Sequence, residues 1–249
     1  MPHIGNDVVD LISPANRQKS TDSRYLKKIL TNTEIEQVLC SDDPNAALWS
    51  IWACKEAAYK VLIKQTGDAV FVPRRWSVHF QNASPAAIRH GRPAPDDEQQ
   101  NENTSEFTTG HVIIPERQTI PVRLFSSFSY RHCLAADCLD ALDQAIWRVV
   151  TLPEAQKGME NDPSAFARGH LARRLGTFLK EDSCQIEIRR QKKDGELQPP
   201  VVYLNDVKTD IDISLSHDGR FVAYAMIYDE LVKSLPQPSL RRRPGSRVS

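Results

Sequence analysis

The segment W-S-I-W-A-C-K-E-A-A-Y-K, Trp49 to Lys60, decides how this sequence is interpreted. It lies in a stretch rich in alanine, leucine and tryptophan, which predicts a long helix over residues 45–65. An ordinary surface helix keeps its charges on one solvated face and its apolar residues on the other. Here Lys55, Glu56 and Lys60 interrupt the apolar run, and the question is what these charges are for.

The composition excludes several classes of function. The chain has 249 residues, and its 32 Lys and Arg balance its 32 Asp and Glu, so no overall charge attracts nucleic acid or a membrane. Any anionic ligand must therefore be held by a local cluster. We expect no signal peptide and no membrane span, because no apolar stretch reaches the ~20 residues that a bilayer requires. The five cysteines lack metal-ligand spacing and are expected to be free thiols, which favours the cytoplasm.

The pattern along the chain predicts an α+β fold of two units. The first unit, residues 1–140, opens with a strand over 4–11 and contains a polar, proline-rich segment at 82–110 that we expect to be a mobile insertion. The second unit, residues 141–232, precedes a tail, 233–249, that we expect to be disordered. The other predicted elements are a strand over 71–80, two strands within 111–137, helices over 141–150 and 164–180, and strands over 185–190, 201–204, 211–216 and 221–228.

The two units are weakly similar, which indicates an internal duplication. Each has a helix followed by strands, with a Ser-x-Ser turn at Ser127 to Ser129 in the first unit and at Ser214 to Ser216 in the second. Two such units with antiparallel sheets, packed about a pseudo-twofold axis, would form a pseudo-dimer within one chain. A monomer would then be sufficient for function. The alternative is chance similarity between two helix-then-strand units.

Three motifs occur in a fixed order: G-N-D-V-V-D-L at residues 5–11, W-A-C-K-E-A-A-Y-K at 52–60 and S-L-S-H-D-G at 214–219. Their combination resembles the 4′-phosphopantetheinyl transferases, with the motif order of the small holo-acyl-carrier-protein synthases and the length of the larger two-lobed members. The resemblance covers most of the chain except the insertion and the tail. It implies Mg²⁺-dependent transfer of the phosphopantetheine arm of coenzyme A to a serine of an apo acyl or peptidyl carrier protein, as in fatty-acid or polyketide synthesis, with release of adenosine 3′,5′-bisphosphate.

The resemblance implies a metal site. Asp7 and Glu56 match the two metal-binding acids of the family, and a shared cation would relieve the repulsion between two carboxylates, roughly 4 kcal/mol at 4 Å and a dielectric of 20. Glu56 would then interrupt the apolar face in order to reach the metal, and we expect it to accept the proton of the carrier serine. Asp10 points to the opposite face of the strand, and Val9 stands where larger members carry a further acid, so we expect a water there.

Lys60 lies one helical turn after Glu56 and matches the family lysine beside the phosphates, so both residues are predicted to be catalytic. Taken alone, the pair would be an ordinary surface ion pair. Lys55 has no assigned role and would be a solvated charge.

The resemblance also implies a coenzyme A site and a carrier-binding surface. Ser214, Ser216 and His217 match the turn that contacts coenzyme A, with the histidine at the 3′-phosphate; the alternative is a polar strand end. Further predicted nucleotide contacts come from Lys60, Arg168, Arg173, Lys192 and Lys193. The residues predicted to hold the acidic helix of a carrier protein are Arg17, Arg24, Lys27 and Lys28.

Alignment of the two units sets Glu56 opposite His170 and His217 opposite Tyr130, and it also sets Lys60 opposite Arg174. The first unit then keeps the acid and the second keeps the histidine, which predicts one composite site at the unit interface. Two alternatives stay open. In the first, the chain is a catalytically inactive homologue that binds coenzyme A or a carrier protein. In the second, it is an unrelated α+β enzyme with no affinity for coenzyme A.

Overall fold

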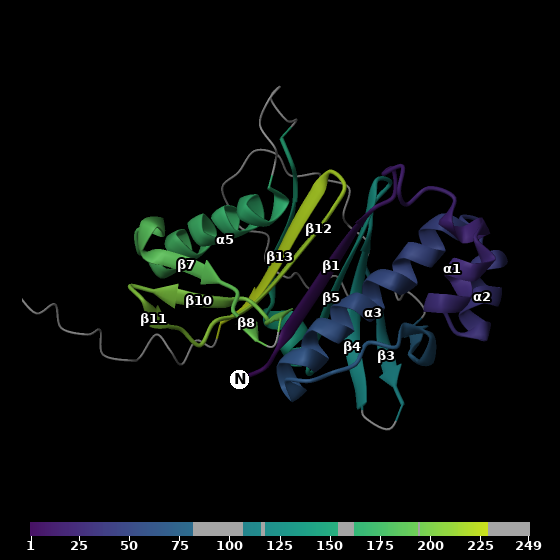
Figure 1. The fold of residues 1–249 in the computed structure, drawn as a ribbon, viewed down its shortest axis with the longest axis horizontal. Helices are drawn as coiled ribbons and strands as arrows, with labels where there is room; N and C mark the ends of the chain where they lie inside the picture. Colours follow the sequence, from purple (N-terminus) through teal and green to yellow (C-terminus); the bar gives the residue numbers. More distant parts are fainter. Residues whose placement is uncertain (82–106, 116–117, 154–161, 194, 229–249) are drawn as a thin grey trace, which may run out of the picture.

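The computed structural model describes residues 1–81, 107–115, 118–153, 162–193 and 195–228, which form a mixed helix and antiparallel-sheet structure (Figure 1). The predicted α+β class is therefore confirmed. The strands of the first sheet, in spatial order, are β1 (Ile4–Asp10), β5 (Tyr130–Ala136), β4 (Gln118–Ser126), β3 (Phe107–Ile114) and β2 (Ser77–Phe80). Those of the second are β12 (Asp212–Asp218), β13 (Phe221–Ile227) and β6 (Ile146–Thr151). Smaller sheets pair β11 (Val207–Lys208) with β10 (Val201–Leu204) and β7 (Ile186–Arg189), and β8 (Lys192–Lys193) with β9 (Glu196–Leu197).

The helices are α1 (Ser23–Ile29), α2 (Asn32–Leu39), α3 (Pro44–Thr66), α4 (Leu139–Gln144) and α5 (Pro163–Leu179), with short 3-10 turns η1 (Lys19–Thr21), η2 (Pro73–Arg75) and η3 (Ser183–Gln185). Two of the helices, α3 and α5, each cover one face of a sheet. Figure 1 shows α3 against the first sheet and α5 against β12 and β13. The helix α3 begins at a cap, where Asp43 accepts the N–H of Ala46, and ends at Gly67, whose φ of 77° suits glycine. None of the helices in the described part of the chain is long and apolar enough to cross a bilayer.

The sheet faces that α3 and α5 leave uncovered pack against each other. Tyr130 of β5 contacts Phe221 of β13 with ring centroids 5.0 Å apart. Phe125 of β4 contacts Trp147 of β6 at 4.2 Å. These contacts lie in buried apolar clusters shared by both sheets. The first half of the chain, with the first sheet, and the second half, with the second sheet, are therefore joined by a continuous core.

Several sequence-based boundaries were wrong. Residues 107–110 were assigned to the insertion but begin β3, and 111–137 contains parts of three strands. The helix predicted over 141–150 ends at Gln144, because the β-branched segment that follows pairs with β13 as β6. The strand predicted over 71–80 begins only at Ser77, after the proline turn η2. Residues 82–106 and the tail predicted at 233–249 lie outside the described residues.

Part of the strand order recurs in the two halves. The first half runs β2-β3-β4-β5-β1, and the second has two separate sheets, β7-β10-β11 and β12-β13-β6, with contacts but no pairing between β10 and β12. In this order Tyr130, which opens β5, corresponds to Phe221, which opens β13. The alignment of Tyr130 with His217 was therefore wrong. Ser127 to Ser129 form the turn between β4 and β5, whereas Ser214 and Ser216 lie inside the strand β12.

All five cysteines are free thiols, as predicted. Cys54 of α3 and Cys133 of β5 are buried, with their sulfur atoms 3.5 Å apart. Cys40, Cys138 and Cys184 are exposed.

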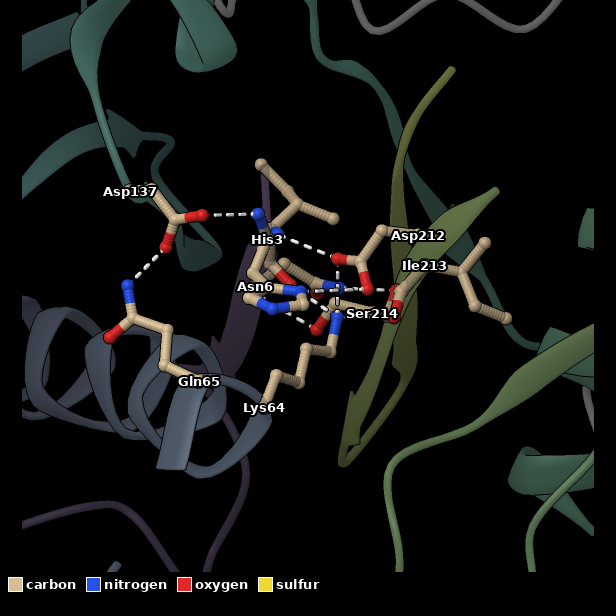
Figure 2. A network of polar contacts seen from close by, with 9 residues as sticks. His3, Asn6, Lys64, Gln65, Asp137, Asp212, Ile213 and Ser214 are labelled. Carbon is tan, nitrogen blue, oxygen red and sulfur yellow. Dashed lines mark hydrogen bonds and ion pairs between the residues drawn. The ribbon is translucent and has the colours of Figure 1, made fainter. Parts of the chain in front are cut away.

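A polar network at one end of β1 ties the two halves together (Figure 2). Lys64 of α3 donates to the carbonyl oxygens of Ile4 and Ile213, at 2.6 and 2.7 Å, and to the Asp212 carboxylate at 2.7 Å. The same carboxylate accepts the backbone N–H of Ile4 at 2.7 Å. The Lys64 side chain is only 6 % exposed, so all three of its N–H donors are satisfied inside the protein. One lysine thus connects α3, β1 and β12.

We predict that Lys64→Met lowers the free energy of unfolding by about 3–5 kcal/mol, because it leaves the Asp212 carboxylate buried without its cation. The double variant Lys64→Met/Asp212→Asn should regain part of that loss, since no unpaired charge is left. Urea unfolding of the two variants checks this, with Lys28→Met, on the exposed face of α1, as the matched control. A Lys64→Met effect no larger than that of the control would contradict the role of the network.

Candidate active site

Gly5 allows α3 to lie directly on β1. A Cβ atom at this position would come within 2.0 Å of the Ala57 carbonyl oxygen and 3.1 Å of Val61. Only glycine permits this approach of helix backbone to strand. The side chain of Asp7 lies two residues along the same face of β1, so it also points toward α3.

Asp7 and two residues of α3 form a cluster of charges. Lys60 donates to the Asp7 carboxylate at 3.0 Å and to the Asn6 carbonyl oxygen at 2.6 Å. Glu56 lies one helical turn before Lys60 and is half-buried. Burial raises the pKa of Asp7, even though Lys60 opposes the rise. Burial and, next, the charge of Asp7 raise the pKa of Glu56 from its ordinary value of 4.5 to about 7.

The donor set of this cluster fits a hard divalent cation. Two carboxylates that repel each other in a partly buried site gain from a shared cation, and Mg²⁺ commonly uses one or two carboxylates with waters and phosphate oxygens. Among the described residues no three or more His, Cys, Asp and Glu side chains are arranged to hold a metal ion.

The outer edge of β1 is bound by side chains of β12 instead of by a paired strand. The Asn6 N–H donates to the Ser214 hydroxyl at 2.9 Å, and the Asn6 amide donates to the Ser214 carbonyl oxygen at 2.6 Å. The Ser216 hydroxyl donates to the Asn6 side-chain oxygen. Ser214 and Ser216 are 2 % and 6 % exposed, so in the structure their hydroxyls join the two halves. Their contact with coenzyme A stays a prediction.

The turn between β12 and β13 is fixed to the end of β1 by a second charge pair. Asp10 is buried and accepts both Nε and Nη2 of Arg220 at 2.8 Å. The Asp10 N–H in turn donates to Asp218 at 2.8 Å, and Asn16 also donates to Asp218. The negative charge of Asp218 contributes to the raised pKa of Asp7, so this residue of the second half lies close to the acid cluster. Asp10 is engaged by Arg220 and does not face the cluster.

Lys55 is the main correction among the charges of α3, because it is fully buried instead of solvated. Its ammonium donates to the Glu34 carboxylate at 2.6 Å and to the carbonyl oxygens of Ile29 and Pro73 at 3.0 and 2.9 Å. Glu34 also closes the capping box with Thr31 at the start of α2. Lys55 therefore holds α1, α2 and η2 to α3.

Part of the predicted positive cluster assembles near His217, which is exposed in β12. Arg168, in the first half of α5, donates to Ser164 at 2.7 Å and lies 3.8 Å from Asp162. His217 and Arg168 both help to lower the pKa of Asp162, after the backbone N–H of Ala165. Arg190, which the sequence interpretation missed, lies close enough to Arg168 for the two charges to interact.

The other predicted binding residues are exposed. Arg173 is five residues after Arg168 on α5, on a different face, and Lys192 lies in the short strand β8. The side chain of Lys193 lies outside the described residues. The residues predicted to contact a carrier protein are all exposed on α1 and the loop before it: Arg17, Arg24, Lys27 and Lys28.

The structure thus brings Asp7, Glu56 and Lys60 together and places β12 against the same strand. Sequence reasoning missed Asn6 and Asp218, although both lie inside the quoted motifs. Their buried or half-buried positions depend on the packing of β1 against β12, which no local pattern encodes.

Comparison with protein families supports the same interpretation of the first half. Residues 3–114 match the model of the 4′-phosphopantetheinyl transferase superfamily, which confirms the resemblance inferred from the motifs. The match includes Asp7, Glu56 and Lys60 and ends before β12. Proteins of this superfamily act on carrier proteins with coenzyme A. No curated protein matches the chain significantly.

We predict opposite effects for two glycine substitutions. Gly5→Ala should lower the free energy of unfolding by about 3 kcal/mol or more, because its methyl group meets the backbone of α3. Gly169→Ala should raise it by about 0.5–1 kcal/mol, because Gly169 lies in α5 with nothing within 4 Å of its Cβ position. Guanidinium unfolding distinguishes them, and equal effects would contradict the close contact at Gly5.

Glu56→Gln is predicted to stabilise the metal-free protein at pH 8. A carboxyl group whose pKa is raised from 4.5 to about 7 on folding costs stability as the pH rises through that range, so the gain should be on the order of 3 kcal/mol at pH 8 and absent below pH 4.5. Thermal unfolding in a chelator, at both pH values, measures it.

Mg²⁺ added at pH 8 should then raise the Tm of the wild type more than that of Glu56→Gln. If Glu56→Gln is less stable than the wild type at pH 8, Glu56 is not a carboxylate that destabilises the fold. If Mg²⁺ raises the Tm of both proteins equally, Glu56 is not a metal ligand.

Proposed function

We propose that this chain, in which residues 3–114 match the 4′-phosphopantetheinyl transferase superfamily, is a Mg²⁺-dependent transferase of the holo-acyl-carrier-protein synthase type. It transfers the phosphopantetheine arm of coenzyme A to a serine of an apo acyl or peptidyl carrier protein and releases adenosine 3′,5′-bisphosphate. The observation that carries the proposal is the cluster of Asp7, Glu56 and Lys60 on β1 and α3. This cluster lies inside the matched region.

The proposed reaction needs a site for a pyrophosphate. Asp7 and Glu56 would hold Mg²⁺, which supplies positive charge to the phosphate oxygens when bound. Lys60 is held by Asp7 and the Asn6 carbonyl, which leaves one of its three N–H donors for an oxygen of the pyrophosphate. A fixed ammonium favours the charge that develops on the leaving phosphate.

Glu56 is proposed as the group that takes the proton of the carrier serine, directly or through a water. The serine oxygen forms a bond to the phosphorus that bears the pantetheine arm, and the bond from that phosphorus to the bridging oxygen breaks. The nucleophile belongs to the carrier protein, so none is required on this chain.

The second half is proposed to complete a composite site. Asn6 joins β12, the strand of His217, to β1, the strand of Asp7, which supports a site with residues from both halves. We propose that His217 and Arg168 contact the nucleotide of coenzyme A, that Ser214 and Ser216 hold β1 next to it, and that Arg173 contributes from the adjacent face.

The recurring strand order supports a pseudo-dimer of two units, in which a monomer is sufficient. The five free thiols support a cytoplasmic location. The alternative of an inactive binding homologue is not favoured, because the acid and lysine cluster is assembled.

The test is the intact mass of an apo carrier protein after incubation with this protein, coenzyme A and Mg²⁺. We expect a gain of one phosphopantetheine with the wild type, a loss of at least ~100-fold in rate with Glu56→Gln, and no gain with a chelator. Glu36→Gln, at an exposed glutamate of α2 outside the predicted binding residues, serves as a folded control with the acid cluster intact. If no carrier gains mass while coenzyme A still binds, the transferase assignment is wrong and the binding homologue is favoured.

A further inference from the structure

Phe128 is the most exposed large apolar side chain in the described part of the chain, at 94 %. It lies at the tip of the turn between β4 and β5. An exposed aromatic ring orders the water around it, and that water is released when a partner covers the ring. Such residues frequently supply the anchor of a protein interface.

The turn that presents Phe128 is firmly held. The Ser127 hydroxyl accepts the N–H groups of Ser129 and Tyr130 at 3.0 and 3.2 Å. Arg131 donates to the carbonyl oxygens of Ser127 and Tyr130, and its Nε donates to Ser50 of α3 at 3.1 Å. A ring on a preordered turn costs little conformational entropy when a partner covers it. The exposure of Phe128 is therefore a built feature of this hairpin.

The turn lies beside the C-terminal end of β1, the strand that carries Asp7. The Leu11 N–H donates to the Ser129 carbonyl oxygen at 2.9 Å, and Asp10 pairs with Tyr130. Asp7 is three residues before Asp10 on β1, which is about 10 Å along a strand. Phe128 is thus roughly 15 Å from the cluster by the same rise per residue.

The exposed cations of α1 lie next to the loop that follows β1. Trp49 of α3 donates to the Asn16 carbonyl oxygen at 2.9 Å and contacts Tyr25 of α1, so α1 is fixed to the loop that follows β1. Arg17 lies in this loop and is exposed. The loop between β1 and α1 therefore has the Phe128 turn on one side and exposed cations on the other.

The geometry points to Phe128 as an apolar anchor for the carrier protein, an inference that rests on the proposed function. A protein whose serine reaches Asp7 and Glu56 buries about 800 Å² on each side, a patch roughly 16 Å in radius. A patch of this radius centred on the acid cluster reaches Phe128. The partner that fits is a carrier with an acidic surface for Arg17 and α1 and an apolar side chain that covers the ring of Phe128.

The experiment measures both transfer and binding for Phe128→Ala. The probes are apo carrier proteins of the fatty-acid, polyketide and peptide-synthetase types, with a serine-to-alanine form of each for binding by titration calorimetry. We expect an approximately tenfold rise in the KM and Kd for the carrier, with the KM for coenzyme A, the kcat at saturating carrier and the Tm unchanged. Phe128→Trp should retain the wild-type KM for the carrier.

The matched control is Val207→Ala, at an exposed apolar residue of β11. Figure 1 shows β11 on the opposite side of the molecule from β3 and β4. A wild type that transfers or binds, with Phe128→Ala within twofold of it, would overturn the anchor and leave the proposed function standing. An equal loss with Val207→Ala would also overturn it, because the effect would then not be local. A wild type that neither modifies nor binds any carrier would overturn the proposed function and the anchor with it.

Discussion

The contact between Gly5 and the Ala57 carbonyl oxygen is the constraint on which the candidate site depends. It lets α3 lie on β1 at backbone distance, and only then do Asp7 on the strand and Glu56 and Lys60 on the helix share one space. The other side of β1 is bound by Asn6 and the serines of β12. One short strand is thus held by both halves of the chain, and it carries the acid that the chemistry needs.

The sequence predicts those features that depend on local pattern. The helix α3 follows from its composition, and Asp7, Glu56 and Lys60 follow from motif order. The features that it misses depend on tertiary contacts. Lys55 looks like a solvated charge, yet its burial is made possible by Glu34 and two carbonyl oxygens from distant segments. The residues of β6 continue the pattern that predicts a helix over 141–150, but their pairing with β13 makes them a strand.

The cost of the site is visible in its electrostatics. Burial and the charge of Asp7 raise the pKa of Glu56 to about 7. The ionised Glu56 carboxylate is therefore less stable in the folded protein than in water. The surrounding polar groups are handled differently: Lys64, Lys55 and Asp10 each have several hydrogen-bond partners. Asp7 and Glu56, in contrast, are two neighbouring carboxylates with raised pKa values, which is a pattern typical of a functional site rather than of a structural ion pair.

The central claim is that the two halves form one site, with the acids on the first half and the nucleotide contacts on the second. The most direct measurement is calorimetric titration of coenzyme A with Mg²⁺ into the wild type, Asp7→Asn and His217→Ala. The account predicts one coenzyme A per chain and weaker binding in both variants, because each half contributes to the same ligand. Binding that depends on Asp7 but not on His217, or on neither, would contradict it.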